Sequence, residues 1–319
     1  MFFVLCGVIS FISVTVIFVQ MDHVDTCKLP SKKFVRQMAY NGGKFSISLH
    51  DPELGHVISK SVLASGHYAS VDEIQNICAH GVVQCGEGRL FVEVGSAVGM
   101  VSLYAASRGM RVRAFDPIGP NVDRVTESQC LNGEAHCHGC ADSSKWGPFA
   151  PERFNVKWTF VDMKPSSPRT VASRRQNMAA TAGGGGKYHA VVNVTSIGAE
   201  IDTDIEVLLL TCQGFEYRAL LGADYLLRKR KIRSIIWRRH SSTSGVSSVN
   251  VFGKIRMLSE QDANAAKIAE LLLVHGYIFY NIESKTSAPT WISPSELTNY
   301  VLSPLYDGAH PNILSVLGK

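Results

Sequence analysis

The sequence has no large excess of charge of either sign. Its 319 residues include 32 basic and 27 acidic side chains, so the formal net charge is only +5, which gives no reason to expect nucleic acid as a partner. Charged residues make up 18% of the chain and apolar residues 45%. This composition excludes an intrinsically disordered or collagen-like chain, and the length allows one large domain or two small ones.

The eight cysteines lack the dense spacing of a small disulfide-stabilised domain, so they assign no redox compartment by themselves. One group looks like a set of metal ligands: Cys130, His136, Cys137, His138 and Cys140. A structural zinc site needs two pairs of ligands, and no second C-x-x-C pair matches this one. Residues 136–140 also fall where we expect the third strand of a sheet, which would turn alternate side chains to opposite faces. We therefore expect no metal site, and a disulfide among these cysteines if the domain lies in an oxidising compartment.

An apolar run near the start of the chain predicts a membrane anchor. Phe2–Val19 contains 18 uncharged residues, close to the roughly 20 that cross a bilayer as a helix. No basic residue precedes it and no small-x-small site follows it, although both are typical of a cleaved signal peptide. We expect residues 1–21 to form an uncleaved single-pass anchor, with a cleaved signal as the alternative.

The orientation of this expected anchor stays open. Four basic residues follow the apolar run, namely Lys28, Lys32, Lys33 and Arg36, and the positive-inside rule would keep the rest of the chain in the cytosol. Enzymes with a lone amino-terminal anchor often face the lumen instead. We expect a membrane protein of the endoplasmic reticulum or Golgi with a luminal domain, and a cytosolic domain is the alternative. The one glycosylation sequon, Asn193-Val194-Thr195, does not decide between them.

Residues 22–88 are expected to form a polar stalk followed by short helices, with a turn at Asn41-Gly42-Gly43 and a helix over Val71–His80. From Arg89 onward, apolar runs alternate with helical stretches, which is typical of a parallel sheet with helices on both faces. The expected strands are Leu90–Val94, Val112–Phe115, Val156–Val161, His189–Val194, Val207–Thr211 and Ile232–Trp237. We assign residues 89–319 to one α/β domain.

Two later stretches have clear local signals. Residues 165–187 contain Gly183–Gly186 and little apolar surface, so we expect a flexible surface insertion there. Ser259, with an acid three residues on, predicts the start of a helix that continues to Val274 and stops at Gly276 before a strand over Tyr277–Ile282.

The strand Leu90–Val94 leads into a turn of small residues, Gly95-Ser96-Ala97-Val98-Gly99, and then into an expected helix over 100–107. Such a turn lets a ligand approach the backbone, and the start of the helix presents unpaired N–H groups. A dinucleotide fingerprint needs glycine at its first, third and sixth positions, but here the third is Ala97 and the sixth is Met100. NAD is therefore disfavoured as a cofactor.

Asp116 ends the next expected strand, 21 residues after Gly95. An acid at this place can accept hydrogen bonds from the two hydroxyls of a ribose. Glu93, the G-x-x-x-G turn and Asp116 together suit S-adenosylmethionine, which has a ribose but no pyrophosphate.

Residues 91–132 resemble the opening of the FkbM-type methyltransferases. Val92-Glu93-Val94-Gly95 is similar to the first-strand motif of that family, Ser102–Ala106 to the helix that follows, and Ala114-Phe115-Asp116-Pro117 to its second-strand acid. The similarity continues at Pro120-Asn121-Val122, Leu131-Asn132, Val207–Glu216 and Gly276-Tyr277. It covers roughly residues 45–285.

This resemblance implies a Rossmann-like class I methyltransferase fold, with a seven-stranded, mostly parallel sheet and helices on both faces. It also implies S-adenosylmethionine as the cofactor, bound at the carboxyl ends of the first strands, as in other open α/β sheets. The implied cofactor-binding residues are Glu93, Gly95, Ser96 and Gly99 near the methionine end, Asp116 at the ribose, and Asp142 at the adenine amine. Asp142 equally fits the cap of a turn or helix.

The second block departs from the family where charge is usual. Thr211 and Gln213 stand in place of an Asp and a Glu, and Leu209 in place of a Lys. A hydroxyl acceptor benefits from a general base, which Thr211 and Gln213 cannot supply. Glu216 and His240 are the remaining candidates, and histidine better matches neutral pH. We expect a diverged methyltransferase acting on an oxygen of a glycan or another hydroxylated small molecule, or a catalytically inactive binding or scaffold module.

A run of basic residues at Arg228–Arg233, continued by Arg238 and Arg239, is the densest positive patch. Phosphate or anionic lipid would suit such a patch. Basic residues are also common at a helix carboxyl terminus, and no aromatic residues interleave with these as a single-stranded nucleic-acid site requires. We expect a solvated helix end here.

Overall fold

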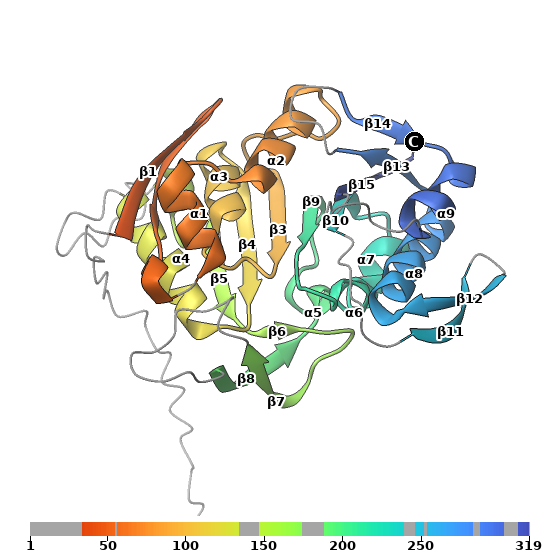
Figure 1. The fold of residues 1–319 in the computed structure, drawn as a ribbon. Helices are drawn as coiled ribbons and strands as arrows, with labels where there is room; N and C mark the ends of the chain where they lie inside the picture. The colour runs from red at the N-terminus through yellow and green to blue at the C-terminus, as the bar shows by residue number, and fades with distance from the viewer. Residues whose placement is uncertain are drawn as a thin grey trace, which may run out of the picture.

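The computed structural model describes residues 34–54, 56–133, 147–173, 188–238, 246–251, 254–282, 288–302 and 312–318. Its centre is an eight-stranded sheet in the order β14-β13-β15-β10-β9-β3-β4-β5 (Figure 1). These strands are β3 Leu90–Val94, β4 Arg111–Asp116, β5 Phe154–Trp158, β9 Ile205–Leu210, β10 Ile232–Arg238, β13 Tyr277–Asn281, β14 Thr290–Ile292 and β15 Asn312–Leu317. The strands from β10 to β5 pair in parallel, whereas β15 runs antiparallel between β10 and β13.

The predicted mostly parallel α/β sheet is confirmed, with two differences. The sheet has one strand more than the seven expected, because β14 pairs with the outer edge of β13. The run predicted at His189–Val194 is a strand, β8 Tyr188–Thr195, but it belongs to a separate three-stranded sheet with β6 Phe160–Val161 and β7 Ser166–Ser173. Five strands, β3, β4, β5, β9 and β10, form the parallel part.

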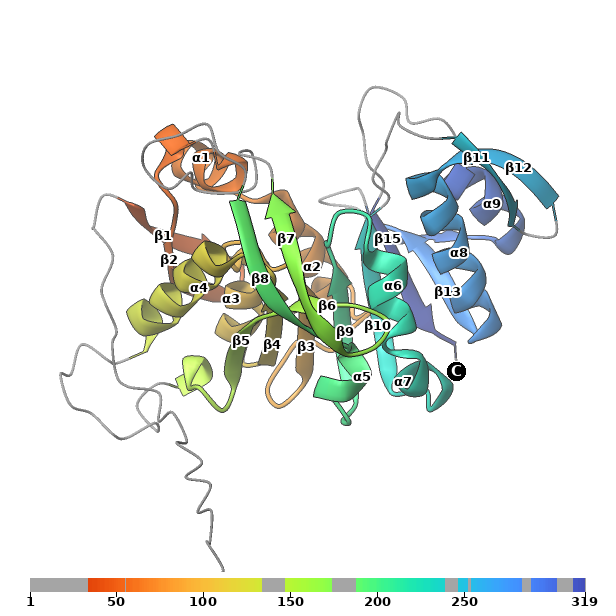
Figure 2. The same ribbon diagram turned by 90° about the horizontal axis from the view of Figure 1, so that it is seen from below.

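Two hydrophobic layers cover the two faces of the central sheet, because side chains alternate along each strand. On β3, Val92 and Val94 pack into one layer and Phe91 into the other. The first layer is covered by α5 Ile197–Glu200, α6 Glu216–Leu221, α7 Asp224–Arg228, α8 Glu260–Val274 and α9 Pro294–Leu302. The second is covered by α1 Val57–Ser65, α2 Ala69–Ala79, α3 Met100–Ser107 and α4 Gly119–Asn132. Figure 2 shows α1–α4 gathered at the left of the molecule and α6–α9 at the right.

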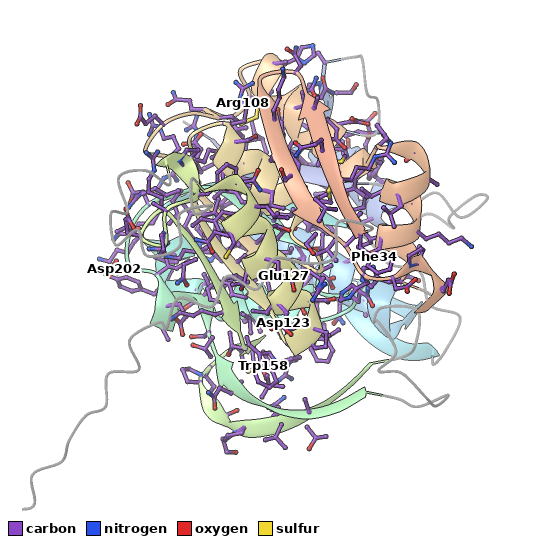
Figure 3. The ribbon with its side chains drawn as sticks, turned by 90° about the vertical axis from the view of Figure 1, so that its left-hand side faces the viewer. Phe34, Arg108, Asp123, Glu127, Trp158 and Asp202 are labelled. Carbon is purple, nitrogen blue, oxygen red and sulfur yellow. A yellow bond between two sulfur atoms is a disulfide. The ribbon has the colours of Figure 1, made fainter. Side chains whose placement is uncertain are left out.

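Residues 34–54 differ from the predicted stalk, because they belong to the fold. β1 Val35–Tyr40 and β2 Gly43–Ser48 pair antiparallel across the predicted turn at Asn41-Gly42. Apolar residues at every second position, including Phe45 and Ile47, are buried in the layer of α1–α4. Figure 3 shows the hairpin beside α4, the helix that carries Glu127.

The insertion predicted at 165–187 is a strand over its first part, since β7 pairs antiparallel with β8; residues 174–187 lie outside the described part. A hairpin of β11 Val246–Val251 and β12 Lys254–Ser259 leads into α8. The predicted helix after Ser259 is confirmed, and Gly276 ends it with a φ of +80°, a conformation that glycine adopts without strain.

The predicted anchor, residues 1–21, lies outside the described residues. Within the described ranges, no helix is both long and apolar enough to cross a membrane. The basic run begins at the end of α7, where Arg228 pairs with Asp224, and the Nζ of Lys231 donates to the Asp202 carbonyl at the amino end of β10. These contacts agree with the expected helix end.

The predicted position of the third strand is wrong. The strand beside β4 is β5 at Phe154–Trp158, so the sheet does not take residues 136–140 as its third strand. His136–Cys140 lie outside the described residues, and Cys130 is disulfide-bonded. A second disulfide joins Cys78 and Cys85. Among the residues that the structure describes, no group of three or more His, Cys, Asp or Glu side chains could hold a metal ion.

Candidate functional site

A cavity opens at the carboxyl ends of β3 and β9. The chain leaves β3 toward β4 on one side and returns to β9 on the other, so these ends flank the point where the strand order reverses, the usual place for a ligand in an open α/β sheet. The cavity is small, about 120 Å³, which is below the ~300–1,000 Å³ of typical small-molecule sites. Its lining residues are Ile58, Tyr68, Ser70, Glu93, Gly95, Ser96, Ala97, Val98, Met100, Val101, Thr211 and Gln213.

The two predicted glycines of the turn make room for protein rather than for a ligand. Gly95 has a φ of +89°, and a Cβ built there would lie 2.6 Å from the Thr211 carbonyl oxygen. Gly99 has a φ of +76°, and its Cβ would lie 2.8 Å from a methyl carbon of Val125 on α4. Both positions favour glycine on backbone and on packing grounds. Gly95 thus lets the turn after β3 contact the segment after β9.

Asp116 joins this turn to the start of α4. Its Oδ2 accepts a 2.8 Å hydrogen bond from the Ala97 N–H, and its Oδ1 accepts from the Ile118 N–H at 2.8 Å and from Asn121 Nδ2 at 3.2 Å. The side chain is 3% exposed, and burial raises its pKa to about 6. A carboxylate accepts about four hydrogen bonds. One acceptor position therefore remains, and both hydroxyls of a ribose could bind only if the Ala97 N–H gave way.

Glu93 is a buried carboxyl on the wall of the cavity. It projects from β3 toward α3, where its Oε2 accepts hydrogen bonds from the Ser102 N–H at 3.1 Å and from the Ser102 hydroxyl. Only 3% of the residue is exposed, and burial raises the pKa of Glu93 to about 8, against the opposing effect of the two Ser102 bonds. At neutral pH the Glu93 carboxyl is therefore largely protonated, and a cation bound beside it would draw off the proton.

Ser96 presents to the cavity a hydroxyl that no described residue hydrogen-bonds. The residue lines the cavity and is 4% exposed, and its Oγ has no hydrogen-bond partner among the described residues. A buried hydroxyl without a partner costs about 1–3 kcal/mol. Such an atom in a cavity wall is the kind of group that a polar ligand satisfies.

The residues after β9 are polar but uncharged where they face the cavity. The Thr211 hydroxyl donates to the Gly95 carbonyl at 3.0 Å, so it ties the two strand ends together. Gln213 lines the cavity with a φ of +50°, which is uncommon for a residue other than glycine. Leu209 is buried within β9.

Of the two predicted base candidates, the structure describes only Glu216. Glu216 is 4% exposed at the start of α6, where its Oε2 accepts from the Gly214 N–H at 2.8 Å, and it is not among the residues that line the cavity. Its carboxyl holds the turn that follows β9. His240 lies outside the described residues, as does Asp142, which precedes β5 in the chain rather than following it.

The amino-terminal helices supply a wall that the sequence analysis missed. Ile58 on α1, Tyr68 before α2 and Ser70 within α2 line the cavity. The Tyr68 N–H donates to the Tyr40 hydroxyl at 2.9 Å, which fixes the segment between α1 and α2 to the end of β1. No spacing in the sequence marks these three residues, because they reach the cavity through the tertiary packing of α1 and α2.

No model of a protein family matches this sequence, and no curated protein matches it. Solved structures resemble its fold. The FkbM methyltransferase of Methylobacillus flagellatus has a TM-score of 0.41 and 13% identity over 74% of this chain and 45% of its own, so this chain spans less than half of that protein. The magnesium protoporphyrin IX methyltransferase of Synechocystis with bound SAM has a TM-score of 0.38 and 13% identity over 82% and 84% of the two chains.

A third similar structure is a TehB-like SAM-dependent methyltransferase from Corynebacterium glutamicum, with a TM-score of 0.39 and 12% identity over 81% of this chain and 94% of its own. These likenesses concern the arrangement of strands and helices. What this chain binds has to be inferred from its own site.

Proposed function

We propose that this chain is an S-adenosylmethionine-dependent methyltransferase whose cofactor binds in the cavity at the ends of β3 and β9. The observation that carries the proposal is that two groups share its wall: the buried carboxyl of Glu93 and the hydroxyl of Ser96, which has no hydrogen-bond partner within the described part of the chain. A ligand with a cationic and a hydrogen-bonding end satisfies both. The resemblance of residues 91–132 to the FkbM-type family supports the same ligand.

The residues present fit this cofactor. Glu93 would hold the ammonium of its methionine part, and Ser96 would hydrogen-bond to a polar atom of the same part. Asp116 would hold the ribose once the Ala97 N–H gives way. When bound, S-adenosylmethionine would supply a methyl group on a sulfonium, to which a nucleophile of the acceptor bonds in line while the carbon–sulfur bond breaks and S-adenosylhomocysteine leaves. The protein would contribute by positioning the reactants and excluding water.

The acceptor that we propose is an oxygen of a glycan or another hydroxylated small molecule, and the family resemblance is its only support. Among the described residues that line the cavity, Glu93 is the only carboxyl and none is a histidine. Glu93 would be engaged by the cofactor. The base for an oxygen acceptor would therefore come from His240 or from the acceptor itself.

A catalytically inactive binding or scaffold module is the second candidate function. It is favoured by the neutral side chains after β9, since Thr211 is committed to the Gly95 carbonyl and Gln213 cannot take a proton. Gln213→Glu separates the two candidates, because it restores one carboxylate without disturbing the Thr211 bond. If the wild-type chain is inactive and Gln213→Glu transfers methyl groups, the wild-type chain is an enzyme that has lost its activity. If the wild-type chain transfers methyl groups, the inactive module is excluded.

We also propose that the domain is anchored to a membrane through residues 2–19 and faces the lumen of the endoplasmic reticulum or Golgi. The support is the apolar run together with the Cys78–Cys85 disulfide and the disulfide-bonded Cys130, since disulfides persist in oxidising compartments and are rare in the cytosol. A cytosolic domain would keep these thiols reduced. Alkylation of free thiols in intact cells and in reduced lysates tests this directly.

Ligand-induced stabilisation tests the cofactor proposal. We expect S-adenosylhomocysteine to raise the melting temperature of the full-length chain, because a ligand at 100 times its Kd adds about 2.7 kcal/mol to the free energy of unfolding. NADH at the same concentration serves as the contrasting ligand and should have no effect. Stabilisation by NADH alone would overturn the proposal.

A further inference from the structure

Two histidines from the amino-terminal segment are buried beside the start of α4. His50 is 4% exposed and His56 1% exposed, and their ring centroids lie 4.5 Å apart. Burial lowers the pKa of His50 to about 4 and that of His56 to about 3, and the nearby charge of Arg124 also disfavours protonation of His50. Both rings are therefore neutral at pH 7, and neither lines the cavity.

A chain of hydrogen bonds connects His50 to the turn after β3. His50 Nε2 lies 3.0 Å from Asn121 Oδ1, and Asn121 Nδ2 donates to Asp116 Oδ1 at 3.2 Å. The other oxygen of Asp116 accepts from the Ala97 N–H. Four side-chain or backbone groups from separate parts of the sequence thus form one continuous path that ends at the cavity wall.

The chemistry of the groups fixes the direction of every bond in this path. A carboxylate only accepts, so the amide nitrogen of Asn121 must face Asp116, and its oxygen must then face His50. The His50 Nε2 must carry the proton, because it has to donate to that oxygen. A single tautomer of His50 therefore holds Asn121 in the one orientation that serves Asp116.

His56 is connected to the backbone of His50 through Ser59. Its Nδ1 accepts a 3.1 Å hydrogen bond from the Ser59 N–H, and Ser59 Oγ accepts from the His50 N–H at 3.0 Å. The backbone of His50 is therefore tied to the start of α1. This bond fixes the backbone from which the His50 ring reaches Asn121.

We propose that His50 is a positioning residue for the ribose of the cofactor, acting through Asn121 to hold the Asp116 carboxylate in place. The inference rests on the proposed function, because it assigns the ribose to Asp116. Loss of the His50 donor removes one of the two hydrogen bonds that fix the Asn121 amide. The amide is then free to shift away from Asp116, which leaves the carboxylate oxygens less firmly placed.

The test compares two ligands and three variants of the full-length chain. S-adenosylhomocysteine and its 2′,3′-dideoxy analogue differ only in the ribose hydroxyls, so the ratio of their dissociation constants reports on the contacts of those hydroxyls, which we assign to Asp116. His50→Leu removes the donor, whereas His50→Gln keeps an N–H near the place of Nε2. Val62→Ala is the matched control, since Val62 is fully buried on the neighbouring helix α1 and has no polar group.

We expect the wild-type chain to prefer the ribose ligand and His50→Leu to lose about threefold to tenfold of that preference, the effect of about one hydrogen bond. His50→Gln should keep most of it, and Val62→Ala should lose stability with an unchanged ratio. An unchanged ratio in His50→Leu overturns the positioning role and leaves the cofactor proposal standing. Failure of the wild-type chain to bind either ligand overturns both.

A spectroscopic measurement on the wild-type chain covers the case in which His50→Leu does not fold. Long-range ¹H–¹⁵N spectra at pH 7 distinguish the two neutral tautomers of a histidine. We expect His50 to be protonated at Nε2. Protonation at Nδ1 would overturn the inference, because the Asn121 oxygen would then have no donor facing it.

Discussion

The Ala97 N–H donates a 2.8 Å hydrogen bond to Asp116 Oδ2, which locks the turn after β3 to the end of β4. Ala97 has a φ of +48°, a conformation that costs an L-residue about 1–2 kcal/mol, so the bond holds the turn against its own backbone preference. The turn that would receive the cofactor is therefore held closed over the acid that would bind the ribose.

Asp116→Asn should destabilise the protein even without a ligand. The three donors around Asp116 would meet an amide with only one oxygen, which leaves at least one N–H facing another donor. We expect the free energy of unfolding to fall by about 1–3 kcal/mol, measured by chemical denaturation. Asp72→Asn is the control, because Asp72 pairs with a partly exposed His67 and should lose less than about 1 kcal/mol. Equal losses in the two variants would contradict this account of Asp116.

Gly95→Ala should cost more stability than Gly88→Ala. Both residues have positive φ values, +89° and +77°, so both substitutions pay a similar backbone cost of about 1 kcal/mol. A Cβ at Gly95 meets the Thr211 carbonyl oxygen at 2.6 Å, whereas a Cβ at Gly88 meets nothing within 4 Å. We expect Gly95→Ala to lose at least about 2 kcal/mol more, as overpacking against backbone does. Equal losses in urea denaturation would show that the contact with Thr211 is unimportant.

Ser96→Ala should separate binding from stability. The Ser96 hydroxyl has no partner among the described residues, so its removal should leave the free energy of unfolding unchanged or raise it by about 1 kcal/mol. The affinity for S-adenosylhomocysteine should nevertheless fall about tenfold. Ser102→Ala is the contrasting variant, because its hydroxyl donates to Glu93 and its loss should reduce stability. If Ser96→Ala binds the ligand as tightly as wild type, Ser96 has no role in the site.

Glu93 should make the protein less stable as the pH rises from 6.5 to 8. Its pKa is raised to about 8 in the folded state, so in this range the folded chain binds a proton that the unfolded chain has already released. The resulting stability is full below the unfolded pKa and is lost as the pH rises through about 8, with a slope of up to about 1.4 kcal/mol per pH unit. Asp116 titrates below this window in the folded state. His50 and His56 act in the opposite direction at its lower end, because their folded pKa values are lowered and the unfolded chain still holds protons on them near pH 6.5. The loss of stability caused by Glu93 is therefore clearest above about pH 7.

Glu93→Gln should remove that slope, which denaturation at several pH values can measure. Glu200→Gln is the control, since the pKa of Glu200 is lowered by its bonds to Lys157 and Thr195, despite partial burial, and it stays ionised throughout the window. A loss of stability from pH 7 to 8 that persists in Glu93→Gln would place the proton elsewhere.

Asn193 offers a test of topology. The residue is exposed on β8, and the sequon Asn193-Val194-Thr195 is glycosylated only in the secretory lumen. We expect the protein from membranes to shift on digestion with an N-glycosidase, and Asn193→Gln to abolish the shift. A luminal domain would be contradicted if digestion caused no shift and if every cysteine reacted with an alkylating reagent in intact cells.

The local patterns of the sequence predicted the parallel part of the sheet well. The strand, turn and helix over residues 90–107 follow from an apolar run, two glycines and a stretch of helix-forming residues. The local patterns do not determine which sheet a strand joins, because that depends on pairing between distant parts of the chain. The apolar run before Asn193 predicts a strand in either sheet, and only its contacts with β6 and β7 place it outside the central one.

The candidate site was predicted in part. Glu93, Gly95 and Ser96 lie at the cavity, because they are fixed by one local motif. The hydrogen bond from the Ala97 N–H to Asp116 depends on the conformation of the turn, which the sequence does not specify. The wall formed by α1 and α2 depends on tertiary packing, and the path from His50 to Asn121 joins residues 71 apart in the sequence.

Calorimetric titration of the full-length chain with S-adenosylhomocysteine tests the central claim most directly, with Ser96→Ala and Asp116→Ala measured alongside. The account predicts one site per wild-type chain, weaker binding by Ser96→Ala despite its undiminished stability, and no binding by a folded Asp116→Ala. A folded wild-type chain that binds neither S-adenosylmethionine nor S-adenosylhomocysteine, or variants that bind as tightly as wild type, would contradict the assignment of this cavity as the cofactor site.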